Sequence, residues 1–261
     1  GEQKAGIDFA DVYAASDLCK RADAQVAALS TPPPGSSPLS FSSEYAQGLG
    51  QQLAVLLNRT ATQYWRNDTY NGVRFAYAVV LGLILGSMYW DTGMKRSSPV
   101  DVFNVMGALF LCINFLGNYN TNGILPVLGG DRPVYYRERA AGMYHPLAYA
   151  LSWALVELPY VLVQSMVYGV ITYYMIQFEH DSAKVAWYLL FTFLLLFFFT
   201  AYGMMIMSVM PFPELAMIAS SLFFSIWAIF GGFFISYPAM PKWWSWLYWL
   251  DPLSYCLYGI I

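Results

Sequence analysis

The chain has 261 residues, of which 58% are hydrophobic and only 11% are charged. Soluble domains usually carry about 25% charged residues, so this composition excludes an ordinary soluble protein and favours a membrane protein. The formal net charge of −3 argues against a nucleic-acid partner. The 3 cysteines lie far apart and form no CxxC pair, which disfavours a metal site or a disulfide framework.

Residues 1–40 are polar enough to belong to a soluble region. Apolar positions between residues 7 and 30 predict one or two short helices that pack on a neighbouring soluble domain. Consecutive prolines at residues 32–34 block both helix and central strand, and they predict a semi-rigid linker. We therefore expect residues 1–40 to be a linker that follows a domain outside this chain.

An amphipathic helix is predicted within residues 41–70. Its apolar side chains recur every three or four residues, while glutamine and asparagine occupy much of the opposite side. The helix ends in Tyr64, Trp65 and Arg66, and such aromatic and cationic side chains suit the headgroup layer of a bilayer. We interpret it as lying on the membrane surface; the alternative is a helix in the core of a soluble domain.

Several apolar stretches follow, each close to or above the roughly 20 residues that a membrane-spanning helix needs. We predict five spans at residues 72–90, 102–119, 147–178, 183–210 and 214–235. Arg74 lies at the mouth of the first span, where its long side chain is expected to snorkel toward the headgroups. The predicted fold class is therefore all-α, a polytopic helical membrane protein whose transmembrane domain covers residues 71–261.

An aromatic segment with tryptophans at positions 243, 244, 246 and 249 follows the fifth span. Because Asp251 and Pro252 interrupt it, we expect this segment to be interfacial or re-entrant, not spanning. The chain ends in apolar sequence and begins without an initiator methionine. We therefore expect it to be a fragment that is truncated at its C-terminus.

The orientation of the spans is predicted from the lysines and arginines in the short loops, which concentrate on the cytoplasmic side of a membrane. One side carries Arg59, Arg66, Arg74, Arg132, Arg137 and Arg139, and the other carries Lys95, Arg96, Lys184 and Lys242. This bias places the N-terminus and residues 132–146 in the cytoplasm. The expected location is integral to a membrane, with the plasma membrane preferred.

The chain lacks the sequence patterns that catalysis or nucleotide binding needs. A phosphate-binding P-loop requires a Gly-Lys pair, and none occurs. His145 and His180 are the only histidines, and neither has a partner at the spacing of metal ligands. We predict no catalytic residue and no metal site, and we do not expect this chain by itself to be an enzyme.

Glu157 lies inside the third apolar stretch, where a carboxylate is costly unless it is paired, protonated or in contact with water. One hypothesis makes it a polar group linked to substrate or coupling; the other makes it a structural hydrogen-bond partner near the kink at Pro159. Four amides in or near the spans either bridge helices or line a path. They are Asn114, Asn118, Asn120 and Gln164.

A charged, aromatic stretch between the second and third spans, residues 132–144, reads Arg-Pro-Val-Tyr-Tyr-Arg-Glu-Arg-Ala-Ala-Gly-Met-Tyr. It closely resembles the first intracellular loop of pleiotropic-drug-resistance transporters, the full-size members of ABC transporter subfamily G. The Glu-Leu-Pro-Tyr-Val sequence at residues 157–161 follows at the expected place, and residues 29–36 resemble the family's linker. The resemblance runs almost end to end and is closest to the plant or algal branch.

Such transporters have two halves, each with a nucleotide-binding domain followed by six membrane helices. The resemblance implies that this chain is most of the second transmembrane domain, of the ABC-2 type, with its sixth helix beyond Ile261. No cofactor is then expected here, because ATP and Mg²⁺ would bind the missing nucleotide-binding domains. The implied partners are those domains, the other transmembrane half of the same polypeptide, membrane lipids and a hydrophobic small-molecule substrate.

The resemblance also implies roles for particular residues. It assigns residues 134–144 as the coupling helix pressed on a nucleotide-binding domain, and residues 44–66 as the connecting, or elbow, helix. Tyr119 matches an aromatic residue that stacks on substrate, and Phe233 with Phe234 matches a bulky valve pair that is often leucine in relatives. The implied coupling residues are Tyr135, Tyr136, Arg137, Glu138, Arg139, Gly142 and Tyr144.

Three functions remain in competition at this point. The leading hypothesis is the membrane-spanning half of an ATP-driven exporter of hydrophobic small molecules or lipids. An ion-coupled carrier or channel is the alternative, although it would need several ionisable groups within the membrane, and only Glu157 is clear. A membrane-embedded enzyme is disfavoured because no catalytic constellation is evident.

Overall fold

The computed structural model describes residues 8–32, 35, 43–95 and 97–261. The chain divides into two compact units, Gly1–Glu44 and Tyr45–Ile261. Most of the proline-rich part of the predicted linker lies outside the described residues, and so does Arg96, which contributed to the predicted orientation.

The described residues of the first unit form two short helices, α1 (Phe9–Ala15) and α2 (Asp17–Ser30). Each begins at a side-chain cap, where Asp8 accepts from the backbone of Ala10 and Ser16 accepts from that of Cys19. Neither helix buries a residue. Their predicted packing on a neighbouring soluble domain therefore stays a prediction.

Helix α3 (Leu49–Trp65) is amphipathic, and it packs against α6 of the second unit. Its buried side chains recur at every fourth residue, which places them on one face. They are Gln52, Leu56, Thr60 and Tyr64. Val55 and Trp65 are exposed on the rest of the helix. The predicted position of this helix on the membrane surface stays a prediction.

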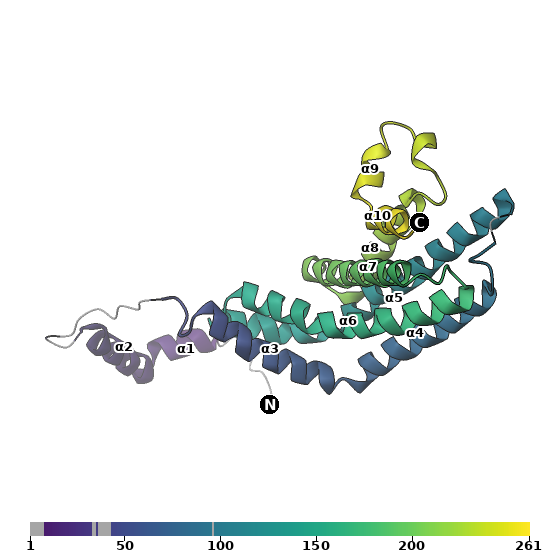
Figure 1. Cartoon of the computed structure of the whole chain (residues 1–261). Helices are drawn as coiled ribbons and strands as arrows, with labels where there is room; N and C mark the ends of the chain where they lie inside the picture. The colour runs from purple at the N-terminus through teal and green to yellow at the C-terminus, as the bar shows by residue number, and fades with distance from the viewer. Residues whose placement is uncertain (1–7, 33–34, 36–42, 96) are drawn as a thin grey trace, which may run out of the picture. The chain divides into compact units, whose positions relative to one another are not determined.

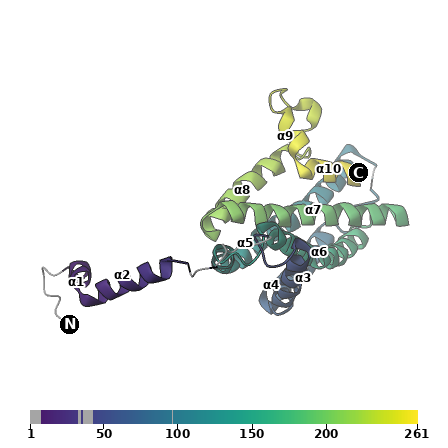
Figure 2. The same ribbon diagram turned by 90° about the vertical axis from the view of Figure 1, so that its left-hand side faces the viewer.

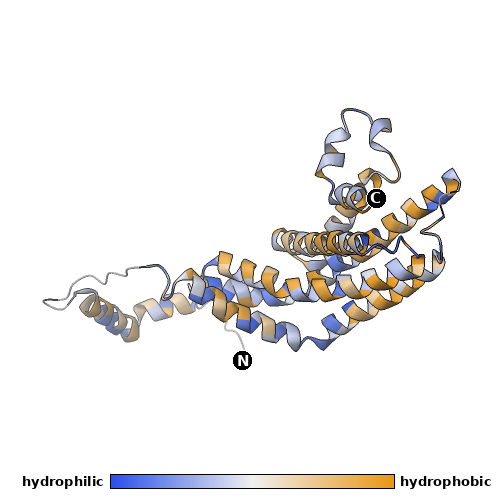
Figure 3. Cartoon of the chain, in the orientation of Figure 1, coloured by the Kyte–Doolittle hydropathy of each residue, from blue (hydrophilic) through white to orange (hydrophobic). Residues whose placement is uncertain are grey.

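Among its described residues, the second unit contains 5 helices that are long and apolar enough to cross a membrane, which confirms the predicted number of spans. Figure 1 shows their arrangement, and in Figure 3, where the ribbon is coloured by hydropathy, hydrophobic residues dominate these helices. Proline begins α5, α6 and α8, where its missing N–H costs no helical hydrogen bond. The helices are α4 (Asp68–Met88), α5 (Pro99–Ala140), α6 (Pro146–Ile176), α7 (Ser182–Val209) and α8 (Pro213–Phe230).

Helix α5 runs from Pro99 to Ala140, well beyond the span predicted at residues 102–119. At 1.5 Å per residue it is ~63 Å long, whereas the hydrocarbon core of a bilayer is only about 30 Å thick. The helix continues through Pro126 and Pro133, so much of the stretch that we predicted as a charged loop is helical. Hydropathy marks only the part of a helix that suits lipid, and it cannot show where the helix ends.

Helices α5 and α7 approach closely near the middle of α5 (Figure 2). A Cβ atom added to Gly203 would lie 2.6 Å from the carbonyl oxygen of Thr121, and one added to Gly117 would lie 2.6 Å from the Phe199 ring. The Thr121 hydroxyl also donates to the Phe199 carbonyl at 3.2 Å. Small residues allow such close packing between membrane helices, so these glycines fix the contact between α5 and α7.

Helix α8 ends at Phe230, earlier than the predicted end of the fifth span at residue 235. Gly231 and Gly232 follow, and Gly232 has a φ of +88°, a conformation that glycine adopts without strain. Three short elements follow, with Trp243, Trp246 and Trp249 exposed among them. These elements are a 3₁₀ turn, η1 (Tyr237–Ala239), then α9 (Ser245–Leu250) and α10 (Pro252–Ile260). At 3, 6 and 9 residues, each is too short to cross a bilayer.

Candidate functional site

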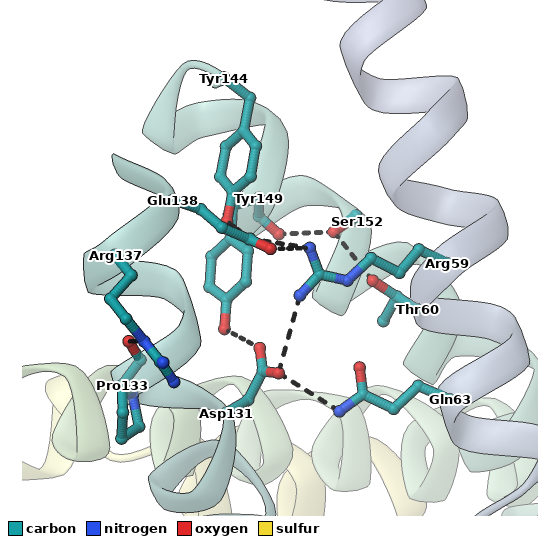
Figure 4. A network of polar contacts seen from close by, with 10 residues as sticks. All are labelled: Arg59, Thr60, Gln63, Asp131, Pro133, Arg137, Glu138, Tyr144, Tyr149 and Ser152. Atoms are coloured by element: carbon teal, nitrogen blue, oxygen red, sulfur yellow. Dashed lines mark hydrogen bonds and ion pairs between the residues drawn. The ribbon is translucent and has the colours of Figure 1, made fainter. Parts of the chain in front are cut away.

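The turn between α5 and α6 is joined to α3 by a polar network (Figure 4). Arg59 of α3 donates from Nη1 to both carboxylate oxygens of Glu138, at 2.8 and 2.7 Å. The Tyr144 hydroxyl donates to Oε2 of the same carboxylate at 2.7 Å. The hydrogen bond to Glu138 raises the pKa of Arg59, and burial together with that carboxylate raises the pKa of Tyr144. Arg59 therefore stays charged and Tyr144 stays a donor at neutral pH.

Asp131 forms a second node of the network and is buried in α5. Its Oδ2 accepts from the Tyr149 hydroxyl at 2.6 Å, and its Oδ1 accepts from Nε2 of Gln63 at 3.3 Å. Nη2 of Arg59 lies 4.0 Å from Oδ1, so one guanidinium bridges two carboxylates. Sequence reasoning did not assign Arg59 or Asp131 to this network. The available signal was an arginine on the amphipathic helix and an acid beside the charged stretch.

Further contacts join α3 to the beginning of α6. The hydroxyl oxygens of Thr60 and Ser152 lie 3.4 Å apart, and the Gln52 side-chain carbonyl accepts from the backbone of His145 at 2.8 Å. These contacts are distributed along most of the buried face of α3. A displacement of the turn between α5 and α6 must therefore move α3 or break several hydrogen bonds.

Two further predicted coupling residues shape the turn itself. The Tyr135 ring stacks on that of Tyr149, with centroids 4.4 Å apart. Gly142 has a φ of +66°, a left-handed conformation that most side chains disfavour. It allows the chain to leave α5 and reverse toward α6 within a few residues.

The remaining predicted coupling residues, Tyr136, Arg137 and Arg139, are exposed on the same end of α5. Arg137 donates to the carbonyl of Pro133 in its own helix at 3.2 Å. Arg139 forms no hydrogen bond or ion pair with any residue that the structure describes. At this end of α5, Glu138 is thus bound to other residues of the chain. The exposed side chains leave the opposite surface open to a partner.

Glu157 forms an ion pair with Arg74 of α4, and the two side chains are 0% and 1% exposed. The Tyr70 hydroxyl also donates to Oε1 of Glu157 at 3.3 Å, and the guanidinium lies 5.0 Å from the Tyr70 ring centre. Our prediction that Arg74 would snorkel is therefore wrong, because its charge is paired with Glu157 inside the helix bundle. Pairing offsets part of the cost of taking both charges out of water, and it gives Glu157 the polar partner that the structural hypothesis requires.

Tyr119 is part of α5, and the Phe233–Phe234 pair contacts the same helix at a different position. The Tyr119 ring stacks on Tyr77 of α4, with centroids 4.0 Å apart. Phe233 stacks on Phe110 at 5.0 Å. Phe110 precedes Tyr119 by two and a half helical turns, which corresponds to about 14 Å. The structure thus separates the predicted substrate-stacking residue from the predicted valve pair.

Two of the amides singled out in the sequence form a bridge between helices. Nε2 of Gln164 in α6 donates to Oδ1 of Asn120 in α5 at 2.9 Å. Asn122, which sequence reasoning did not single out, accepts from the Ser220 hydroxyl of α8 at 3.0 Å and donates to Asn118 at 2.6 Å. Asn120 and Gln164 therefore bridge helices, while Asn118 belongs to a polar row between α5 and α8.

Within the described part of the chain, no three His, Cys, Asp or Glu residues are grouped so that they could hold a metal ion. Cys112 and Cys256 are buried and Cys19 is partly exposed, and all are free thiols.

Comparisons with known proteins agree with this architecture. Residues 51–261 match the family model described as "ABC-2 type transporter". The chain is 43% identical over 260 residues to "ABC transporter G family member 53" of Oryza sativa subsp. japonica and to "Pleiotropic drug resistance protein 1" of Nicotiana tabacum. It is 45% identical over 260 residues to "ABC transporter G family member 34" of Oryza sativa subsp. japonica. Each alignment covers 100% of this chain but only 18% of the relative.

Proposed function

Because the chain belongs to the ABC-2 type transporter family, we propose that it forms the membrane-spanning half of an ATP-driven exporter of hydrophobic small molecules or lipids. ATP and Mg²⁺ would bind in nucleotide-binding domains outside this chain, which spans only 18% of the length of its relatives. Its role would be to form the translocation path together with the other transmembrane half. The plasma membrane is the proposed location.

The observation that carries this proposal is the network around Glu138 at the end of α5. Charge-assisted hydrogen bonds are short and directional, so they transmit a displacement with little slack. A nucleotide-binding domain that pressed on residues 134–144 would move α5 directly, because these residues begin inside that helix. The same push would reach α3 through the bond between Glu138 and Arg59.

We further propose that the N-terminus and residues 132–146 face the cytoplasm. The cluster of arginines at this end of the bundle supports that orientation. Asn58 and Asn67 both begin glycosylation sequons, and in this topology neither reaches the glycosylation machinery. A glycan on either residue in the native protein would reverse the assigned orientation.

The coupling role is tested in the full-length transporter, reconstituted in proteoliposomes. Glu138→Gln and Arg59→Gln should each reduce substrate transported per ATP hydrolysed several-fold, with substrate affinity within about twofold of wild type. Because the two residues share one contact, the double variant should be no worse than the more impaired single variant. Arg66→Gln, at the exposed end of α3, is the matched control and should keep normal coupling.

Two results would count against the proposal. Normal coupling in a correctly inserted Glu138→Gln protein would remove the network from the mechanism. Transport driven by an ion gradient in the absence of ATP would favour the alternative, an ion-coupled carrier or channel.

A further inference from the structure

A cavity of about 500 Å³ opens where the ends of α5 and α7 meet the beginning of α6. It lies at the end of the bundle that carries the turn between α5 and α6. Its lining includes Arg132, Arg139, Trp153 and Met205, and it includes none of Tyr119, Phe233 and Phe234. The cavity is therefore distinct from the proposed substrate path.

The cavity is lined by two arginines, Arg132 and Arg139, and by no acidic residue. Its charge is therefore positive. Arg132 donates to the carbonyls of Ser208 and Pro211 at 3.2 and 3.0 Å, and to the Tyr136 hydroxyl at 3.1 Å. Those acceptors are neutral, so none of them compensates the positive charge of the guanidinium. Arg139 forms no hydrogen bond or ion pair with the described residues. By contrast, Arg59 is paired with carboxylates.

The remaining walls are amphipathic. Tyr135, Tyr136, Tyr149 and Trp153 supply aromatic side chains of the kind that concentrates at headgroup depth. Methionines of α7 supply flexible, apolar walls that adapt to irregular shapes. They are Met204, Met205 and Met207. A ligand that fits must combine an anionic group with an apolar body.

Apolar surface continues from this end of α6 along the bundle. Leu147, Leu151 and Leu155 are all exposed and recur at every fourth residue, so they form one stripe on the helix surface. Ala150 lines the cavity and lies one helical turn after Leu147, so the cavity adjoins the beginning of this stripe. Acyl chains could lie along this stripe while a charged headgroup occupies the cavity.

We propose that this cavity binds the headgroup of an anionic phospholipid from the leaflet at the α5–α6 turn. Arg139 contacts the phosphate, and Arg132 adds its charge while it holds the end of α7. Basic pockets between membrane helices on the cytoplasmic side are a known way to select anionic lipids. A bound lipid would also touch Tyr149, whose hydroxyl bonds to Asp131. Lipid occupancy would thereby support the network around the turn.

The test measures lipids retained by the purified full-length transporter, using native mass spectrometry with phosphatidylserine and phosphatidylcholine in parallel titrations. Wild-type protein should retain phosphatidylserine in preference to phosphatidylcholine. Arg139→Gln should weaken phosphatidylserine retention about fivefold, the change expected when one cation is lost near an anionic surface. Arg139→Lys should recover most of the preference. Arg137→Gln is the matched control, because Arg137 lies on the same helix end but does not line the cavity.

Several outcomes would overturn the proposal. Equal retention of the two lipids by wild type, or equal losses in Arg139→Gln and Arg137→Gln, would show only general surface charge. Competition by inorganic phosphate or glycerophosphoserine as strong as that by the intact lipid would show an anion site without lipid chains. Unchanged lipid retention in Arg139→Gln, with impaired ATPase coupling, would assign Arg139 to a protein partner. None of these outcomes would contradict the transporter assignment, which the coupling variants test separately.

Discussion

The two ends of α5 are held in place by opposite kinds of contact. At the end near α6, Asp131 and Glu138 are fixed by hydrogen bonds and ion pairs to Arg59 and two tyrosines. At the other end, the rings of Phe103 and Phe110 stack on Phe233 at 5.1 and 5.0 Å. The end near α6 is therefore positioned by ion pairs and directional hydrogen bonds, and the other end by aromatic packing.

This difference suits different tasks. A charge-assisted hydrogen bond is strong only within a narrow range of distance and angle, so it holds its partners in one register. Aromatic pairs remain favourable over centroid distances of about 4.5–7 Å, so they permit sliding. The polar end is suited to receiving a push from a neighbouring domain. The aromatic end is suited to opening and closing without a large energetic penalty.

The largest effect is expected at the buried ion pair between Arg74 and Glu157. Like the contacts at the polar end of α5, this pair depends on charge. Glu157→Leu leaves Arg74 buried and unpaired, which should destabilise the protein by ~3–5 kcal/mol. Fluorescence-detected size-exclusion chromatography of the full-length variant should then show little monodisperse protein. The double variant Arg74→Met/Glu157→Met should recover most of it, since no charge is left uncompensated.

The double variant also decides between the two hypotheses for Glu157. If it folds and transports at the wild-type rate, the pair is structural. If it folds but does not transport, Glu157 acts on substrate or coupling. A Glu157→Leu protein as stable as wild type would show that the ion pair contributes little.

Tyr119 lies between the two ends and tests where the substrate binds. Tyr119→Ala should weaken binding of aromatic or polycyclic substrates by about 1 kcal/mol or more, because a stacked ring is lost. Tyr119→Phe keeps the ring and should bind nearly as wild type. The measurement is substrate affinity at matched surface expression. Unchanged affinity and substrate profile in Tyr119→Ala would mean that this side chain only packs on Tyr77.

The smallest effect on binding is expected at the aromatic end. The double variant Phe233→Ala/Phe234→Ala should change the transport rate while substrate affinity stays within about twofold, because a valve acts on passage. Phe230→Ala, just before the glycine turn, serves as a control for the loss of a ring in this region. Wild-type transport by the double variant would remove the valve role that the family resemblance implied.

The fold was largely predictable because membrane spans are marked by composition. Five spans and the amphipathic helix follow from hydropathy and helical periodicity, and the resemblance carried by residues 132–144 is confirmed by the comparisons. The helix ends were less predictable. The glycine pair after Phe230 ended α8 early, while Pro126 and Pro133 failed to end α5. Proline within a membrane helix is tolerated when neighbouring packing compensates for the lost hydrogen bond.

The sequence did not allow us to predict which charged residues pair with each other. Glu157 was recognised as unusual, but its partner Arg74 is 83 positions away along the chain. Arg59 and Glu138 are separated by 79 positions. Such pairings depend on the way α3 and α4 pack against α5 and α6, and periodicity carries no information about that. The roles of Tyr119, Phe233 and Phe234 remain predictions for the same reason.

The glycine contact between α5 and α7 has a mechanical consequence. Thr121 lies close to the midpoint of α5, with about 30 Å of helix on either side. A stiff helix that pivots at such a point behaves as a lever with two arms of nearly equal length. A displacement of the Glu138 end in one direction would carry the Phe103 end by a similar distance in the opposite direction. Gly203, by bringing α7 against that midpoint, would set the fulcrum.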